Sequence, residues 1–251
     1  MAGSTYSWER NAPVLAAEGY NVVAVDVPPF GYSEKDPNYN QSNDSRAALL
    51  WAFLNQINPN AQWNLIGHSM GGGIVQAMAI IHPERVNKVI FVDPALFGSP
   101  GGKTSYGPAI LKFRPIEWIA TGIGKLFLVR PKQIGKLLRS AYAAEPDAAD
   151  VAEYYKALHQ RGFARAFLRS SVKSKPLIPL DGLKFNKPAL AIWGDKDTWV
   201  PLGPNQTLLD QLPTVKLQII EGAGHCPMAT HSNIFNDHVL QYLQTNISKI
   251  K

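Results

Sequence analysis

Short apolar runs rich in β-branched residues recur along the chain and are bounded by turn-forming residues. Such runs are typical of strands that are buried on both faces of a parallel sheet. They cover Tyr20–Val25, Trp63–Ile66, Val89–Val92, Ala189–Trp193 and Val215–Ile220. Stretches with apolar residues at helical spacing lie between most of them, at Ser7–Glu18, Ser45–Asn55, Met70–Ile81, Asn205–Gln211 and Asn233–Gln244. The alternation predicts an α/β fold, with a mostly parallel sheet flanked by helices on both faces.

The alternation stops between Asp93 and Lys187, where no convincing strand is found. The segment instead contains four helical candidates, at Ile110–Leu128, Pro131–Ala144, Asp147–Gln160 and Phe163–Val172. Ligands of open α/β sheets bind at the carboxyl ends of the strands. We therefore expect a helical lid (cap) over residues 97–183, inserted between a first core segment, 1–96, and a second, 184–251.

The strongest local motif is Gly67-His68-Ser69-Met70-Gly71, directly after a predicted strand and before a predicted helix. A sharp strand-to-helix turn projects a serine hydroxyl toward a base, and flanking glycines allow close backbone approach. The amide of Met70 would then point at the oxygen that becomes negative during acyl transfer. A plain glycine-rich turn is the alternative, but the strand before and the helix after favour Ser69 as a nucleophile.

A carboxylate and a histidine follow two later strands, in the order expected for the partners of such a serine. Asp197 lies after the strand Ala189–Trp193, and His225 lies in a glycine-rich loop after Val215–Ile220. His225 would accept the proton of Ser69, and Asp197 would orient the imidazole. A loop histidine is the alternative for His225. For the acid, Asp195 is interpreted as a turn or capping residue and Asp93 as the end of an earlier strand. We expect Ser69, His225 and Asp197 to converge in one cleft.

Three further residues near these motifs are candidates for the substrate pocket. Met70, His68 and Trp199 are assigned to oxyanion or substrate binding, although packing is favoured for His68 and equally expected for Trp199. The single cysteine, Cys226, is interpreted as a packed small hydrophobic side chain, because it has no base of its own.

With these residues the chain resembles the α/β-hydrolase superfamily, and in particular its lid-bearing esterases, lipases and carbon–carbon bond hydrolases. Three further segments are similar to family motifs: Val25–Ser33, His82–Val86 and Val92–Ala95. The resemblance implies hydrolysis of a small-molecule ester or lipid-like substrate through an acyl-enzyme on Ser69. The serine disfavours haloalkane dehalogenase and epoxide hydrolase, whose relatives carry aspartate there. Carbon–carbon hydrolase and thioesterase stay open as alternatives, as does a non-catalytic protein with this fold.

The chain departs from the family pattern near its beginning. Pro29 stands where the family loop usually has glycine, and Met1 falls near the last position of a His-Gly-x turn whose amide is the usual second oxyanion donor. Family members carry three strands before this point, the third lying between the strands at Tyr20–Val25 and Trp63–Ile66. We therefore expect the N-terminal strands to be missing, or the sheet to close differently, and turnover to be weak.

The distribution of charge along the chain bears on which partners the protein can bind. The 251 residues carry a formal charge of +6. Fifteen Lys and Arg against six Asp and Glu lie between Gly98 and Lys184, but no nucleic-acid-binding motif accompanies them. Basic and apolar residues interleave between Lys112 and Arg139. That pattern allows peripheral contact with an anionic membrane, but a solvated lid face is favoured.

The sequence contains few motifs that indicate a cofactor, a metal or a cellular compartment. No zinc-ligand spacing, Gly-x-Gly-x-x-Gly motif or phosphate loop occurs, so no cofactor and no metal is expected. The sequence has no signal-peptide pattern and no apolar run of about 18 residues, so a cytoplasmic location is favoured. The single cysteine excludes an internal disulfide and only weakly supports a reducing compartment. The oligomeric state stays open.

Overall fold

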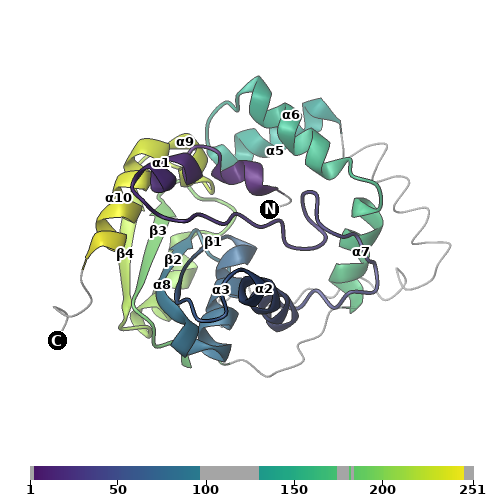
Figure 1. Ribbon diagram of the computed structural model, residues 1–251. Helices are drawn as coiled ribbons and strands as arrows, with labels where there is room; N and C mark the ends of the chain where they lie inside the picture. Colours follow the sequence, from purple (N-terminus) through teal and green to yellow (C-terminus); the bar gives the residue numbers. More distant parts are fainter. Residues whose placement is uncertain (1–2, 97–129, 174–180, 182–183, 246–251) are drawn as a thin grey trace.

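The computed structural model describes residues 3–96, 130–173, 181 and 184–245, and its centre is a four-stranded sheet (Figure 1). The strands are β1 (Trp63–His68), β2 (Val86–Val92), β3 (Ala189–Gly194) and β4 (Val215–Ile220). They pair in parallel, in the order β1-β2-β3-β4. The α/β fold class expected from the alternating pattern is confirmed, and the strands at these four positions agree with the predicted ones.

Helices cover both faces of this sheet (Figure 1). One face packs against α2 (Asn43–Ile57), α3 (Met70–Ile81) and α8 (Leu202–Asp210), and the other against α1 (Ala12–Ala17) and α10 (Ser232–Gln244). Three short elements complete this core, η1 (Thr5–Trp8), η2 (Pro83–Arg85) and α9 (Pro227–Thr230). None of the helices within the described ranges is long and apolar enough to cross a lipid bilayer.

Strand β2 shows why its sequence is apolar without interruption. Successive side chains of a strand point to opposite faces. Val89 and Phe91 therefore enter the core beneath α2, α3 and α8, whereas Ile90 and Val92 enter the core beneath α1 and α10. All four side chains are fully buried. A strand in the middle of a parallel sheet has two buried faces, and the periodicity of two disappears from its sequence.

One charged residue, Lys88, is buried on β2, with only 4% of its surface exposed. Its ammonium donates hydrogen bonds to the carbonyl oxygens of Tyr242, Leu243 and Thr245, at 2.9, 2.8 and 2.6 Å. The last carbonyls of a helix have no partner within the helix. Lys88 therefore caps the end of α10 and ties this helix to the sheet.

The strand predicted at Tyr20–Val25 is wrong. The segment pairs with none of the described strands, and a cavity of about 750 Å³ is lined both by this segment and by β1. Val22 and Val23 are about 40% exposed. Within the described residues, the backbone from Asn21 to Val25 makes no hydrogen bond. The local apolar pattern is that of a strand, but a strand also needs a neighbour at hydrogen-bonding distance, and β1 lies beyond the cavity.

The segment between β2 and β3 contributes the helices α5 (Pro131–Tyr142), α6 (Ala148–Leu158) and α7 (Phe163–Lys173). These agree with three of the four helical candidates, and the fourth, at 110–128, lies outside the described residues. The carbonyl oxygen of Ala141 in α5 accepts a hydrogen bond from the amide of His225, at 2.6 Å. The helical segment thus reaches the loop that follows β4.

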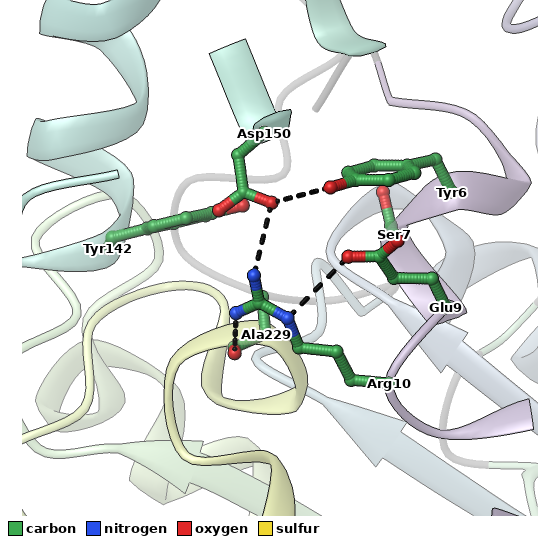
Figure 2. A pocket seen from close by; sticks show the side chains of 7 residues that line it. All are labelled: Tyr6, Ser7, Glu9, Arg10, Tyr142, Asp150 and Ala229. Atoms are coloured by element: carbon green, nitrogen blue, oxygen red, sulfur yellow. Dashed lines mark hydrogen bonds and ion pairs between the residues drawn. The ribbon is translucent and has the colours of Figure 1, made fainter. Parts of the chain in front are cut away.

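A polar cluster joins α6 to the beginning of the chain (Figure 2). Tyr6 donates its hydroxyl to the carboxylate of Asp150, at 3.0 Å. Arg10 donates to Asp147 and to the carbonyl oxygen of Ala229, at 2.9 and 2.7 Å. Asp150 is only 3% exposed, and Arg10 lies 3.4 Å from it. The buried charge is thus paired, and the cluster links η1, α6 and α9.

Replacing Lys88 with methionine is expected to lower the free energy of unfolding. The variant keeps the length of the side chain but removes the Lys88 donor from three carbonyl oxygens at the end of α10, at a cost of about 1–3 kcal/mol. Tyr242 still accepts from the amide of Thr245, whereas Leu243 and Thr245 are left without a donor among the described residues. Lys216→Met on exposed β4 is the matched control. Urea unfolding followed by circular dichroism measures both. Equal midpoints for the two variants would contradict a capping role for Lys88.

Candidate active site

Ser69 connects β1 to α3 through a backbone conformation that is rare for residues other than glycine, with φ 54° and ψ −122°. Two hydrogen bonds to the end of β2 and the loop after it help to hold it there. Its amide donates to the carbonyl oxygen of Val92, and its carbonyl oxygen accepts from the amide of Ala95, both at 2.9 Å. Strain of this kind persists where the surroundings over-determine it. The end of β2 therefore fixes the turn that carries Ser69.

The two glycines that flank Ser69 have different surroundings. A Cβ added at Gly67 would lie 2.4 Å from the carbonyl oxygen of Gly71, whereas a Cβ added at Gly71 would meet no described atom within 4 Å other than its chain neighbours and the backbone of its own helix. Gly72, one residue further, is also crowded, with a Cβ contact of 2.4 Å to Pro94. The expectation that both flanking glycines permit close backbone approach is therefore wrong for Gly71. Gly67 and Gly72 are the glycines that the turn needs.

His225 lies in the loop after β4 and is 1% exposed. Its Nε2 lies 2.9 Å from Ser69 Oγ, and its Nδ1 lies 2.7 Å from Asp197 Oδ2. A carboxylate can only accept, so Nδ1 carries the proton and Nε2 is free to accept from the serine hydroxyl. The structure thus brings Ser69, His225 and Asp197 into one hydrogen-bonded chain at the ends of β1, β4 and β3.

The carboxylate of Asp197 is oriented by three hydrogen bonds, two of which come from its own loop. Its Oδ1 accepts from the amides of Trp199 and Val200, at 2.7 and 3.0 Å, while Oδ2 accepts from His225. Burial by itself would raise the pKa of Asp197. The hydrogen bond and charge of His225, together with the two amides, hold the pKa below its usual value instead. Asp197 is therefore ionised near neutral pH.

Asp195, the other aspartate of this loop, is exposed and accepts a hydrogen bond from the amide of Gly222, at 2.7 Å. This contact fits the interpretation of Asp195 as a turn residue. It joins the loop after β3 to the loop after β4. The two loops that carry Asp197 and His225 are thus fastened to each other outside the site.

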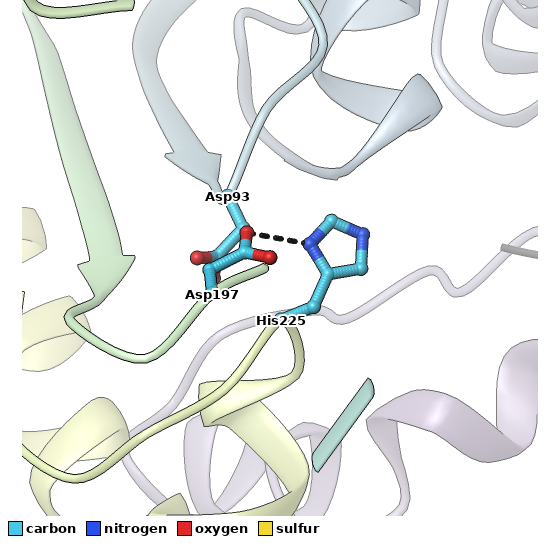
Figure 3. Close-up of side chains that lie close together, drawn as sticks. All are labelled: Asp93, Asp197 and His225. Atoms are coloured by element: carbon cyan, nitrogen blue, oxygen red, sulfur yellow. Dashed lines mark hydrogen bonds and ion pairs between the residues drawn. The ribbon is translucent and has the colours of Figure 1, made fainter. Parts of the chain in front are cut away.

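A second carboxyl group, that of Asp93, lies beside Asp197 and His225 (Figure 3). One side-chain nitrogen or oxygen from each of the three residues lies within 4.8 Å of the others. Among the described histidines, cysteines, aspartates and glutamates, only these three have side-chain atoms close enough to bind one metal ion together. The hydrogen bond between Asp197 and His225 already occupies one atom of each of those two residues. The sequence interpretation assigned no site role to Asp93. The sequence feature that could have indicated such a role is the position of Asp93 directly after β2, the strand that pairs with β3.

The ring of His68 packs against that of His225, with ring centroids 4.8 Å apart. Its Nε2 donates to the carbonyl oxygen of His225, at 2.6 Å. Burial, followed by the charge of His225, lowers the pKa of His68 well below its usual value, so the ring is neutral. Cys226 Sγ lies 4.0 Å from the same nitrogen, and burial raises the pKa of this thiol. These contacts support a packing role for both residues.

Met70 and Trp199 flank the chain of hydrogen bonds. Met70 is the first residue of α3, where a backbone amide has no acceptor within the helix. The indole of Trp199 stacks on His225, with centroids 5.7 Å apart and planes at 18°. Its Nε1 donates to Ser140 Oγ in α5, at 3.1 Å. Trp199 therefore lies between His225 and the helical segment.

Comparison with known proteins places the chain in one family. A sequence profile described as the alpha/beta hydrolase fold matches residues 1–111. A 2-hydroxy-6-oxononadienedioate/2-hydroxy-6-oxononatrienedioate hydrolase of Dechloromonas aromatica is 30% identical over 248 residues, covering 94% of this chain and 81% of that protein. The chain belongs to the α/β-hydrolase family, and the relative named above is a hydrolase.

Solved structures agree with this assignment. A membrane phospholipase A, described as a bacterial virulence factor, is 26% identical with a TM-score of 0.73, covering 96% of this chain and 75% of that one. An esterase of Exiguobacterium antarcticum is 19% identical with a TM-score of 0.74, covering 97% of this chain and 88% of that one. At 19% identity, the similarity to the esterase shows a shared fold only.

The unequal surroundings of Gly67 and Gly71 give a test of the turn. Gly67→Ala is expected to destabilise the protein by several kcal/mol or to prevent folding, because its Cβ would overlap the carbonyl of Gly71. Gly71→Ala, in the first turn of α3, is expected to leave stability unchanged or to raise it by up to about 1 kcal/mol. Thermal unfolding of both variants measures this. An equally large loss of stability in Gly71→Ala would contradict the difference between the two positions.

Proposed function

We propose that this protein is a serine hydrolase that cleaves carboxylic esters through an acyl-enzyme on Ser69, with His225 and Asp197 as its catalytic partners. The observation that carries the proposal is the continuous chain from Ser69 Oγ through His225 to Asp197, with contacts of 2.9 and 2.7 Å. A serine hydroxyl becomes a nucleophile when an adjacent base takes its proton. The burial of all three side chains strengthens their interactions, because little water competes.

In the proposed reaction, Ser69 Oγ attacks the ester carbonyl and its proton passes to His225 Nε2. Asp197 holds the imidazole by Nδ1 and stabilises the imidazolium. The carbon–oxygen bond then breaks, and the leaving alcohol takes the proton from His225. Water attacks the acyl-enzyme by the same route, with His225 again as the base, and releases the acid. The amide of Met70, at the N-terminus of α3, is assigned to the oxyanion. The second donor expected at Met1 lies outside the described residues.

We assign residues 97–183 to a cap over this site, with the core formed by 1–96 and 184–251. The assignment is supported by two contacts of α5, one from Ser140 to Trp199 and one from Ala141 to the His225 amide. Helix α5 buries Ile134 and Leu138 within the protein and exposes Lys132 and Lys136. For this helix, the arrangement supports a solvated basic face. The basic residues from 112 to 129 lie outside the described ranges.

Ser69→Ala is expected to abolish covalent labelling by a fluorophosphonate, which reacts with activated serine hydroxyls. Ser45→Ala, at a partly buried serine on α2, is the matched control and should label like the natural protein. Intact-protein mass spectrometry measures the adduct, and circular dichroism shows that each variant is folded. Labelling of a folded Ser69→Ala protein at the natural rate would remove Ser69 as the nucleophile.

Carbon–carbon bond hydrolysis is a second candidate, favoured by the activity for which the Dechloromonas aromatica relative is named. The same site would serve it: Ser69 attacks a ketone carbonyl, and the carbon–carbon bond breaks with its electron pair on the departing carbon. That carbon then takes a proton, and water releases the acyl group as an acid. The two candidates differ in the leaving group, which is an oxygen in esters and a carbon in this case.

The two candidates are distinguished by comparing p-nitrophenyl butyrate with 2-hydroxy-6-oxononadienedioate as substrates. An esterase is expected to have a kcat/KM at least about tenfold higher on the ester, which corresponds to about 1.4 kcal/mol in transition-state binding. Release of p-nitrophenolate and mass analysis of the acids measure the two reactions, with Ser69→Ala as the blank. Faster cleavage of the dienedioate would instead support the carbon–carbon hydrolase.

A further inference from the structure

The buried Asp93, directly after β2, has no assigned function in the reaction above. It is fully buried and has a positive φ of 41°. Its amide donates to the carbonyl oxygen of Ile192, and its Oδ1 accepts from the amide of Gly194, both at 3.0 Å. These contacts to β3 fix both its backbone and one carboxyl oxygen. The other oxygen, Oδ2, has no hydrogen-bond donor among the described residues.

The neighbour of this carboxyl group is the carboxylate of Asp197 (Figure 3). Asp197 already accepts from three donors, the amides of Trp199 and Val200 and the imidazole of His225. Those donors favour the ionised form of Asp197. Two adjacent carboxylates in a water-poor site repel each other strongly, and one of them then retains its proton. Asp93, with a single donor, is the one expected to retain it.

The other titratable groups around Asp93 do not offset a second negative charge. His225 shares its Nδ1 proton with Asp197, and the thiol of Cys226, in the same loop, is kept neutral because burial raises its pKa. Within the described ranges no lysine or arginine forms an ion pair with Asp93. Burial, followed by the charge of Asp197, raises the pKa of Asp93 well above its usual value, against the opposing hydrogen bond from Gly194.

We propose that Asp93 is a neutral carboxylic acid in the resting protein and donates its proton to the carboxylate of Asp197, so that it acts as a positioning residue for the catalytic acid. The unpartnered Oδ2 is the atom available to carry this proton. The three side chains Asp93, Asp197 and His225 then hold a single negative charge.

The consequence for catalysis rests on the proposed function. His225 must accept a proton from Ser69 and then return it to the leaving group. A second carboxylate beside it would stabilise the imidazolium further and hinder the return of the proton. A neutral Asp93 avoids this and adds a fourth donor that orients Asp197. Its proton is therefore expected to matter most as the pH rises and Asp93 begins to ionise.

The position of the proton can be tested without any activity. Asp93→Asn keeps the acceptor for Gly194 and supplies an N–H to Asp197, so it resembles the neutral acid but does not titrate. In the natural protein the raised pKa means that the folded state holds a proton that the unfolded chain has lost. Stability is therefore lost as the pH rises toward the folded-state pKa. The Tm of Asp93→Asn minus that of the natural protein is expected to increase from pH 4 to pH 9.

Asp237→Asn, at an exposed aspartate of α10, is the matched control, and its Tm difference should change less between pH 4 and pH 9 than that of Asp93→Asn. A Tm difference for Asp93→Asn that is constant with pH, or that falls as the pH rises, would overturn the proposal. That outcome would mean that Asp93 does not bind a proton preferentially in the folded state. The measurement uses the whole chain and requires no substrate.

The rate of fluorophosphonate labelling tests the positioning role. Asp93→Leu, which cannot donate, is expected to slow labelling of Ser69 by about tenfold or more, the order of one charge-assisted hydrogen bond. Asp93→Asn is expected to restore most of that rate and to lack the decline of the natural protein at alkaline pH. A slowing in Asp93→Asn as large as that in Asp197→Asn would overturn the proposal, since it would mean that the reaction needs an ionised Asp93.

If no form of the protein is labelled, the proposed function fails, and the Tm measurement still decides whether Asp93 holds the proton.

Discussion

The parallel hydrogen bonding of β1 to β4 is the constraint on which the candidate site depends. In a parallel sheet every strand ends at the same edge, so residues far apart in sequence emerge next to each other. Ser69 follows β1, Asp93 follows β2, Asp197 follows β3 and His225 follows β4. The register places His68 opposite Val92 and Gly194 opposite Ile220, and these pairs bring the four turns to a common level. The short loops after the strands then need to move each side chain only a small distance, because the sheet already places the four strand ends side by side.

Burial gives these four side chains their chemical differences. Two aspartates occupy one water-poor site, yet the pKa of Asp197 is held down by its donors, whereas that of Asp93 is raised by desolvation. Environments that push the pKa values of neighbouring acids apart are typical of sites that perform acid–base chemistry. His68 beside them is neutral for a related reason, since burial disfavours its charged form. The residue types at this edge are ordinary, and their protonation follows from where they are packed.

The helical segment contributes to this edge through backbone and side-chain contacts of α5. Ala141 accepts from the amide of His225, and a Cβ at Gly224 would lie 2.5 Å from the same carbonyl oxygen. Trp199 stacks on His225 and donates to Ser140. The loop of His225 is thus held from the side of α5 as well as from the sheet. Changes in the helical segment are therefore able to affect the imidazole, even though no side chain from the described part of that segment belongs to the hydrogen-bonded chain.

The sequence by itself determined the α/β fold class, four strands and most of the helix positions, and it predicted Ser69, Asp197 and His225 as candidate catalytic residues. Those features have local causes: apolar runs, helical periodicity, and a glycine-flanked serine between a strand and a helix. Tertiary structure decided what depends on neighbours. Tyr20–Val25 has the composition of a strand but no adjacent strand edge to pair with. Gly71 has the motif position of a crowded glycine but open space around it. Asp93 looked like the end of a strand, and only the packing of β2 against β3 placed its carboxyl group beside that of Asp197. Pairing, crowding and desolvation are properties of the space around a residue, and the local sequence does not contain them.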